Sequence, residues 1–271
     1  MTSEVFAPAK INLTLHVTGQ RADGYHLLDS LVVFANVGDR LWFEPGPEMS
    51  LKVSGPFAQG VPTDQRNLVW QAAELAGWTG RITLEKNLPH GAGIGGGSAD
   101  AAATLTALGG SAKAATLGAD VPVCMRLAPT RMRGIGDQLD AADGIPPCWA
   151  VLVWPGVGVA TPDIFKRLKN KTNSEMPEVL PTFQDHTGMT EWLGGMRNDL
   201  QASCEALVPE VSQALKALAG CEGAGLARMS GSGSTCFGLF ETLSQADAAA
   251  QKIARAHPEW WVKSCVLGQV N

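Results

Sequence analysis

Hydrophobic residues alternate with polar ones near the start of the chain. Four aliphatic side chains occupy every second position there: Ile11, Leu13, Leu15 and Val17. A period of two is typical of a strand that buries one face. Lys10 and Asn12 fall on the opposite face, and the pattern alone leaves open whether this face meets solvent or lines a cleft.

Further patterns predict a chain in which strands and helices are mixed. Short apolar runs bounded by turn residues predict strands at residues 27–34, 40–44, 51–54, 81–85, 149–154 and 261–266, and a strand–turn–strand at 226–240. Helical spacing predicts a helix capped by Asn67 and others at residues 98–108, 163–169, 199–207, 209–219 and 244–257. Because the order shows no regular βαβ repeat, we expect an α+β fold rather than a doubly wound sheet.

Length and composition are compatible with two domains. The chain has 271 residues, of which 45% are hydrophobic and 17% charged, so it can build a packed core. A loop-like segment at residues 137–147 precedes the apolar strand that begins near Trp149. We therefore expect an N-terminal, ATP-binding domain at residues 1–147 and a C-terminal domain at residues 148–271.

Charge and apolar runs bear on partners and location. A net charge of −5 with scattered basic residues disfavours a nucleic-acid partner. The longest apolar run, residues 148–160, is broken by Pro155 and is too short to span a bilayer, and residues 1–10 contain no apolar secretory segment. Six cysteines without a CxxC pair or zinc spacing are typical of reduced, mostly buried thiols. We expect a cytoplasmic protein.

The strongest chemical signal is a glycine-rich stretch at residues 89–99. Five of the seven positions 91–97 are glycine, and an alanine-rich helix follows at once. Backbone N–H groups that converge there, together with the helix N-terminus, can bind an anion. The stretch therefore favours phosphate binding over a flexible surface loop with an ordinary Ser98 cap.

Two familiar phosphate loops fit this stretch poorly. Gly91, Gly93 and Gly96 satisfy G-x-G-x-x-G, but residues 86–90 separate them from the preceding strand, where a dinucleotide fold needs an immediate turn. No acidic residue closes a second apolar strand about twenty residues further on, as that fingerprint requires. A P-loop is excluded because the chain contains no Gly-Lys-Ser/Thr.

Two further segments are candidates for catalysis. Residues 230–234, Ser-Gly-Ser-Gly-Ser, form either a tight hairpin or a second loop able to approach a phosphate. Asp120 lies among small residues and is either a turn residue or the base that phosphoryl transfer to a hydroxyl group needs. Lys10 is a candidate for a cation that keeps such a carboxylate ionised and stabilises charge on the phosphoryl oxygens.

Together these segments resemble those of the GHMP kinases. The resemblance is carried by residues 7–13 (APAKINL), 21–26 (RADGYH), 89–99 and 117–123, and residues 230–234 are similar to the family's third motif. It implies a two-domain architecture with a cleft between the domains, and a kinase that uses ATP with Mg²⁺. The implied ATP-binding residues are Pro89, His90, Gly91, Ala92, Gly93, Ile94, Gly95, Gly96, Gly97, Ser98 and Ala99.

The segments at residues 7–13 and 21–26 also imply an acceptor. They are similar to those of the branch that phosphorylates a cytidine-diphospho sugar alcohol in the non-mevalonate pathway to isoprenoid precursors. By this resemblance, Asp120 is the base and Lys10 its charged partner in a direct transfer. The implied substrate-binding residues are Asn12, Tyr25, His26 and Phe165, and Tyr25 and His26 would hold the cytosine.

Other functions stay open at this point. Another GHMP enzyme, of the homoserine or mevalonate type, would leave residues 23–26 unexplained. A nicotinamide-dependent oxidoreductase is a remote alternative that rests on G-x-G-x-x-G alone, and a silent nucleotide-binding protein conflicts with the presence of Lys10 and Asp120. The expected partners are ATP and the cytidine-diphospho substrate, with no nucleic acid, no membrane and no dedicated metal cluster. The sequence leaves the oligomeric state open.

Overall fold

The computed structural model describes residues 4–269, which form two compact units that are discontinuous along the chain. The first unit contains the chain up to Lys10, together with Val37–His90 and Gly95–Leu127. The second unit contains Ile11–Asn36, Gly91–Ile94 and the chain from Ala128 onward. Two strands therefore pass from one unit into the other, and the glycine-rich stretch contributes residues to both.

The first unit is built on a small mixed sheet. Its strands are β4 (Ser50–Ser54), β5 (Gly80–Glu85), the second half of β3 (His26–Pro45) and the start of β1 (Val5–Asn12). β5 pairs antiparallel with β3 and parallel with β4. Every second residue of β5 points into the core, so Ile82 and Leu84 are buried while Arg81 is exposed.

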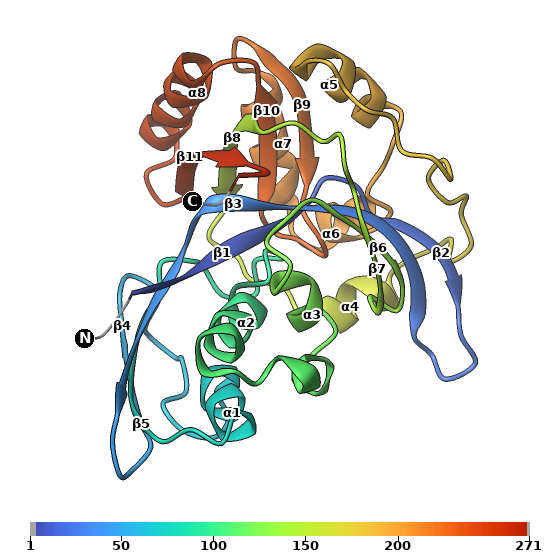
Figure 1. Cartoon of the computed structure of the whole chain (residues 1–271). Coiled ribbons are helices and arrows are strands. Elements are labelled where there is room, and N and C mark those ends of the chain that lie inside the picture. The colour runs from blue at the N-terminus through green and yellow to red at the C-terminus, as the bar shows by residue number, and fades with distance from the viewer. Residues whose placement is uncertain (1–3, 270–271) are drawn as a thin grey trace. The chain divides into compact units, whose positions relative to one another are not determined.

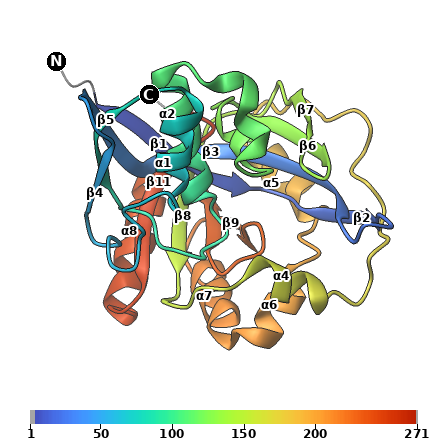
Figure 2. The ribbon, with the colours of Figure 1, turned by 90° about the horizontal axis from the view of Figure 1, so that it is seen from below.

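Helices α1 (Leu68–Leu75) and α2 (Gly96–Leu108) pack side by side in this unit (Figures 1 and 2). The side chain of Asn67 accepts a hydrogen bond from the backbone N–H of Val69, which confirms the predicted cap of α1. Gly95 and Gly109 adopt left-handed conformations at the two ends of α2, where residues with a β-carbon are disfavoured. A short 3₁₀ helix (Ser111–Thr116) and α3 (Val121–Cys124) follow.

The second unit contains an antiparallel sheet in the order β11-β8-β10-β9. These strands are β8 (Cys148–Trp154), β9 (Ala224–Met229), β10 (Cys236–Phe240) and β11 (Trp261–Leu267). Helices α7 (Pro209–Ala219) and α8 (Leu243–Ala256) both contact this sheet and each other, so they cover one face of it (Figure 1). The core between them includes Val151, Leu218, Phe240 and Ile253.

The remaining elements of the second unit extend from the first half of β3. That half pairs antiparallel with β2 (His16–Gln20) and β6 (Thr130–Gly134), and β6 pairs in turn with β7 (Gln138–Ala141). Three helices complete the unit: α4 (Thr161–Lys166), α5 (His186–Gly194) and α6 (Gln201–Leu207).

The mixture of strands and helices confirms the predicted α+β class. The strand predicted over residues 11–17 is wrong in one respect, because β1 ends at Asn12 and β2 begins at His16. The polar face of this segment is not solvated: Lys10 and Asn12 are both buried. The predicted loop at residues 137–147 contains β7, and α5 lies in a polar region for which no helix was expected.

Some predictions about organisation stay predictions. The domain boundary after residue 147 is one of them. The two units are defined by contacts in space and each combines separate stretches of the chain, so they do not test a single boundary in the sequence. The cleft between domains and the cytoplasmic location are others. All six cysteines are buried, as the sequence indicates. From residue 4 to residue 269, no helix has both the length and the apolar character needed to cross a membrane.

Candidate functional site

The end of the glycine-rich stretch opens helix α2 in the first unit. Gly95 is the N-cap residue with φ +66°, and none of the side chains that the structure describes caps the helix. A β-carbon at Gly95 would lie 3.3 Å from the Cβ and Cε atoms of Lys10, so glycine permits the lysine to pack against the loop. The N–H groups at the start of α2 are therefore available to an anion, as a phosphate site requires.

Lys10 and Asp120 form a direct ion pair in the same unit. Lys10 Nζ lies 2.8 Å from Asp120 Oδ2. The lysine side chain is 5% exposed, whereas the carboxylate is 36% exposed at the start of α3. The pair thus joins a buried cation to a carboxylate that a ligand can reach.

A buried cluster of three charges lies at the base of the same loop. Lys86 Nζ donates to Asp100 Oδ2 at 2.7 Å and also to Asp39 Oδ2. The other oxygen of Asp39 accepts from the backbone N–H groups of Asn87 (2.5 Å) and Leu88 (2.9 Å). No motif in the sequence marks this cluster, because its members come from β3, the end of β5 and α2.

Burial and the neighbouring charges together shift the pKa values of Asp100 and Lys86. Burial raises the pKa of Asp100, which the Lys86 ammonium opposes and the Asp39 carboxylate reinforces. For Lys86, burial lowers the pKa, but the two carboxylates outweigh it and raise the value above that of a free lysine. Asp100 Oδ1 is buried without a hydrogen-bond partner among the described residues. One ammonium is therefore shared between two carboxylates.

The middle of the glycine-rich stretch packs against residues 230–234 in the second unit. A β-carbon on Gly93, which has φ +73°, would lie 2.6 Å from the carbonyl oxygen of Gly233 and 2.7 Å from that of Ser230. Ser230 Oγ donates to the carbonyl of Gly93 (3.2 Å), and Thr235 N donates to the carbonyl of Ala92 (3.0 Å). The two glycine clusters therefore meet in space, a condition that the sequence left open.

Asn12 lies beside these clusters in the second unit. Its backbone N–H donates to Ser230 Oγ (3.1 Å), and its side-chain amide donates to Ser30 Oγ (2.7 Å). The Oδ1 atom is buried and has no partner in the part of the chain that the structure describes. An unsatisfied buried acceptor is costly, so a donor from a ligand would be favourable there.

Three residues are predicted to bind the cytosine: Tyr25 has an exposed ring, and His26 and Phe165 form a stacked pair. Tyr25 is 62% exposed. The rings of His26 and Phe165 stack with centroids 4.6 Å apart and planes at 25°. Burial, followed by the nearby Lys171, lowers the pKa of His26. Its Nε2 atom is buried and unpaired within the described residues.

The remaining loop residues differ in exposure. Pro89 is buried and His90 is exposed, with His90 Nε2 2.5 Å from the carbonyl oxygen of Phe57. Ile94 and Ala99 are buried, and Gly97 is exposed at the start of α2.

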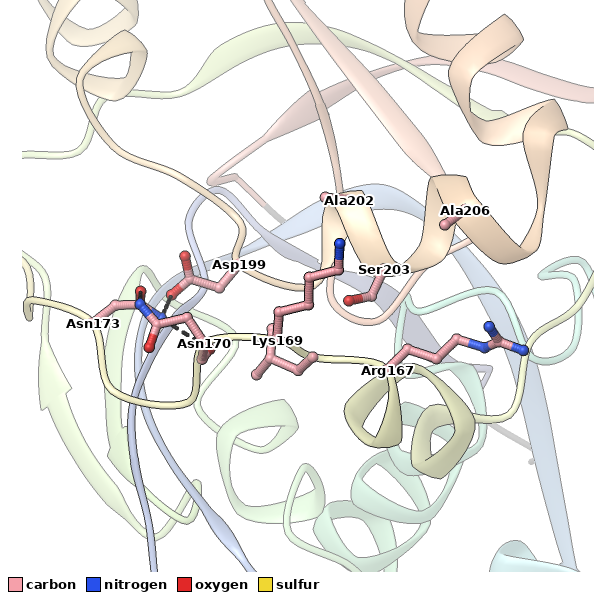
Figure 3. Close-up of a pocket in the computed structure, with 9 residues that line it drawn as sticks. Arg167, Lys169, Asn170, Asn173, Asp199, Ala202, Ser203 and Ala206 are labelled. Carbon is pink, nitrogen blue, oxygen red and sulfur yellow. Dashed lines mark hydrogen bonds between the residues drawn. The ribbon is translucent and has the colours of Figure 1, made fainter.

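A pocket of about 520 Å³ lies beside α4 and α6 in the second unit (Figure 3). Its lining includes Arg167, Lys169, Asn173 and Ser203, and none of the site residues predicted from the sequence is among the described residues that line it. It begins two residues after Phe165. Sequence reasoning missed it because its walls come from two separate segments, residues 167–173 and 199–206, which no shared motif connects.

The comparisons with known proteins agree along the whole chain. Family models described as "GHMP kinases N terminal domain" and "GHMP kinases C terminal" match residues 67–137 and 181–259. A protein of Dinoroseobacter shibae named 4-diphosphocytidyl-2-C-methyl-D-erythritol kinase is 55% identical over 269 residues, which cover 97% of this chain and 94% of that protein. The chain belongs to the GHMP kinases, in the family of 4-diphosphocytidyl-2-C-methyl-D-erythritol kinases. The resemblance carried by its sequence motifs is confirmed.

Solved structures of small-molecule kinases share the fold. A crystal structure of 4-(cytidine 5'-diphospho)-2C-methyl-D-erythritol kinase superimposes with a TM-score of 0.77 at 34% identity, covering 98% of this chain and all of that one. A homoserine kinase of Cytophaga hutchinsonii superimposes with a TM-score of 0.63 at 17% identity, covering 100% and 95%, which speaks for the fold alone. The chain is a small-molecule kinase, and its family implies ATP as the phosphoryl donor. The oxidoreductase alternative has no support.

Proposed function

We propose that this kinase transfers the γ-phosphoryl group of ATP to the 2-hydroxyl group of 4-diphosphocytidyl-2-C-methyl-D-erythritol, a step of the non-mevalonate pathway. The observation that carries the proposal is the 55% identity, over nearly the full length of both chains, to a relative with that printed name. The Lys10–Asp120 pair supports it, because transfer to a hydroxyl group needs a base beside a cation.

Asp120 acts as the base in this proposal. Its carboxylate takes the proton of the 2-hydroxyl group as that oxygen bonds to the γ-phosphorus and the bond to the ADP oxygen breaks. Lys10, at 2.8 Å, fixes the orientation of the carboxylate and offsets the negative charge on the phosphoryl oxygens. Burial of the lysine stem beneath Gly95 keeps the ammonium in one position.

The glycine-rich stretch, Pro89 to Ala99, binds the ATP phosphates in this proposal. The uncapped start of α2 supplies N–H donors and the positive end of the helix dipole. Between residues 4 and 269, no group of three or more His, Cys, Asp or Glu side chains could hold a metal ion. Because Mg²⁺ prefers oxygen ligands, the nucleotide phosphates would carry it, and it would neutralise part of their charge when bound.

Four residues of the second unit recognise the acceptor in this proposal: Asn12, Tyr25, His26 and Phe165. The exposed ring of Tyr25 is a surface on which cytosine can stack, and Phe165 supports His26 from one side. The Nε2 of His26 and the Oδ1 of Asn12 have no hydrogen-bond partner between residues 4 and 269, so each is a polar atom that could bond to a substrate group.

Replacing Tyr25 by alanine should weaken acceptor binding selectively. Loss of base stacking, worth about 1–3 kcal/mol, would raise the Kd for cytidine diphosphate by roughly 5- to 150-fold and leave the Kd for an ATP analogue unchanged. Calorimetry with each nucleotide measures both constants. Val179→Ala, at a side chain that is 82% exposed, is the control and should change neither. Equal loss of both affinities in Tyr25→Ala would refute the division of roles.

A substrate panel tests the proposed activity itself. The protein is incubated with ATP, Mg²⁺ and, in separate reactions, the cytidine-diphospho erythritol, homoserine and mevalonate, and ADP release is measured. We expect release only with the first acceptor. Turnover confined to homoserine or mevalonate would overturn the proposal in favour of those GHMP activities.

A further inference from the structure

The buried cluster of Lys86, Asp39 and Asp100 bonds to both flanks of the glycine-rich stretch. On one side, Asp39 accepts hydrogen bonds from Lys86 and from the backbone N–H groups of Asn87 and Leu88, directly before Pro89. On the other side, Asp100 lies in the first turns of α2 and accepts from the same lysine at 2.7 Å. A single ammonium thus links the entry of the loop to its exit, and every one of these contacts lies within the first unit.

The cluster is buried too deeply to be an ordinary surface ion pair. The side chains of Lys86, Asp39 and Asp100 are 4%, 0% and 4% exposed. Taking three charges out of water is costly, and three apolar side chains of similar volume would avoid this cost. In return, the three charges hold three segments at a fixed separation: β3, the residue directly after β5, and α2.

Glycine-rich backbone has little side-chain packing of its own to hold it. Gly95 and Gly96 carry no β-carbon, and a β-carbon on Gly96 would lie 3.5 Å from Lys86 Nζ, so the loop exit passes close over the lysine. A phosphate site made of backbone N–H groups is effective only when those groups are already aligned. The anchors that align them must therefore lie outside the loop.

We propose that Asp39 and Asp100 are positioning residues for the nucleotide: through Lys86 they hold the two flanks of the phosphate-binding loop at a fixed separation. This inference rests on the proposed function of the loop in binding ATP. Neither carboxylate contacts the nucleotide in this proposal. Because both act by positioning the loop, replacing either one should weaken the binding of ATP and leave the binding of the acceptor unchanged.

The experiment compares Asp39→Asn, Asp100→Asn and the double variant in the full chain. The Kd for the analogue adenylyl imidodiphosphate with Mg²⁺ and the Kd for cytidine diphosphate are measured by calorimetry. We expect each single variant to raise the Kd for the ATP analogue at least tenfold and the Kd for cytidine diphosphate less than twofold. Because both carboxylates act through one lysine, the double variant should be no more than about twofold worse than the poorer single variant.

Glu44→Gln is the matched control. Glu44 lies on β3, as Asp39 does, and pairs with Arg81 of β5 at 3.6 Å, but both side chains are at least half exposed. Glu44→Gln should leave the Kd values for the ATP analogue and for cytidine diphosphate unchanged. Hydrogen exchange provides a second readout: amides of residues 86–90 and 95–100 should exchange faster in Asp100→Asn, with α7 and α8 unaffected. If Asp39→Asn does not fold, Asp100→Asn alone decides the matter.

The possible failures can be told apart. Unchanged affinity for the ATP analogue in Asp100→Asn, or parallel loss of both nucleotides, would overturn the positioning role while leaving the proposed activity intact. If the unaltered protein phosphorylates none of the tested alcohols but its variants lose affinity for the analogue as described, the proposed function fails and the positioning role stands.

Discussion

Replacing Asp120 by asparagine should lower kcat by about 10²- to 10⁴-fold, the usual contribution of a general base. Asparagine keeps the shape of the side chain and an acceptor for Lys10, which lies 2.8 Å away in the unaltered protein, but it cannot take up the proton of the attacking hydroxyl group. Affinity for ATP should change less than about threefold, because no nucleotide contact is removed. Steady-state kinetics with varied ATP and acceptor measure both quantities.

Asp140→Asn is the matched control for this variant. Asp140 also forms an ion pair, with Arg133 at 2.8 Å, but the pair is exposed and lies in β6 and β7. The kcat of Asp140→Asn should stay within about twofold of that of the unaltered protein, since exposed ion pairs contribute little to stability. Near-normal turnover in Asp120→Asn, with the acceptor saturating, would show that another group takes the proton.

Much of the architecture could be predicted from local patterns. The helix after Asn67 begins where its amide caps the chain, and the predicted helix over residues 98–108 appears as α2 from Gly96 to Leu108. These elements follow from propensity, capping and alternation, which are properties of neighbouring residues. The glycine-rich stretch could be recognised for the same reason, because its composition is local.

The tertiary part of the site could not be predicted in this way. Alternation placed Lys10 and Asn12 on one face of a strand, but burial of that face depends on residues far along the chain, such as Asp120 and Ser230. The Lys86 cluster is a clearer case. One lysine and two aspartates that are far apart in the sequence form no motif, and only the fold brings their charges within hydrogen-bond distance.

A second buried ion pair of the same kind, formed by Arg131 and Asp29, should have the largest effect on stability. Arg131 Nε and Nη2 lie 2.9 and 2.8 Å from the two oxygens of Asp29, and its guanidinium also donates to the carbonyls of Pro177 and Glu178. Asp29 in turn accepts from the backbone N–H of Met176 (2.8 Å). The pair therefore fixes the segment at residues 176–178 against β3 and β6 within the second unit.

Arg131→Met should destabilise the protein by about 3–5 kcal/mol, because it leaves the buried Asp29 carboxylate without its cation. That loss corresponds to a fall in Tm of roughly 6–20 °C for a protein of this size. Arg133→Met, two residues along the same strand, is the control: its partners Asp140 and Glu178 are exposed, and the cost should be below about 1 kcal/mol. Thermal unfolding followed by circular dichroism measures both.

The double variant Asp29→Leu/Arg131→Met separates the charge from the contacts. If the cost of Arg131→Met arises from an unpaired buried carboxylate, removing that carboxylate as well should recover a large part of the Tm, since apolar replacement of a buried pair is often neutral. If the cost arises from the lost bonds to Pro177 and Glu178, the double variant should be no more stable than the single one. A Tm for the double variant at or below that of Arg131→Met would therefore assign the stabilisation to the anchored segment and contradict the ion-pair account.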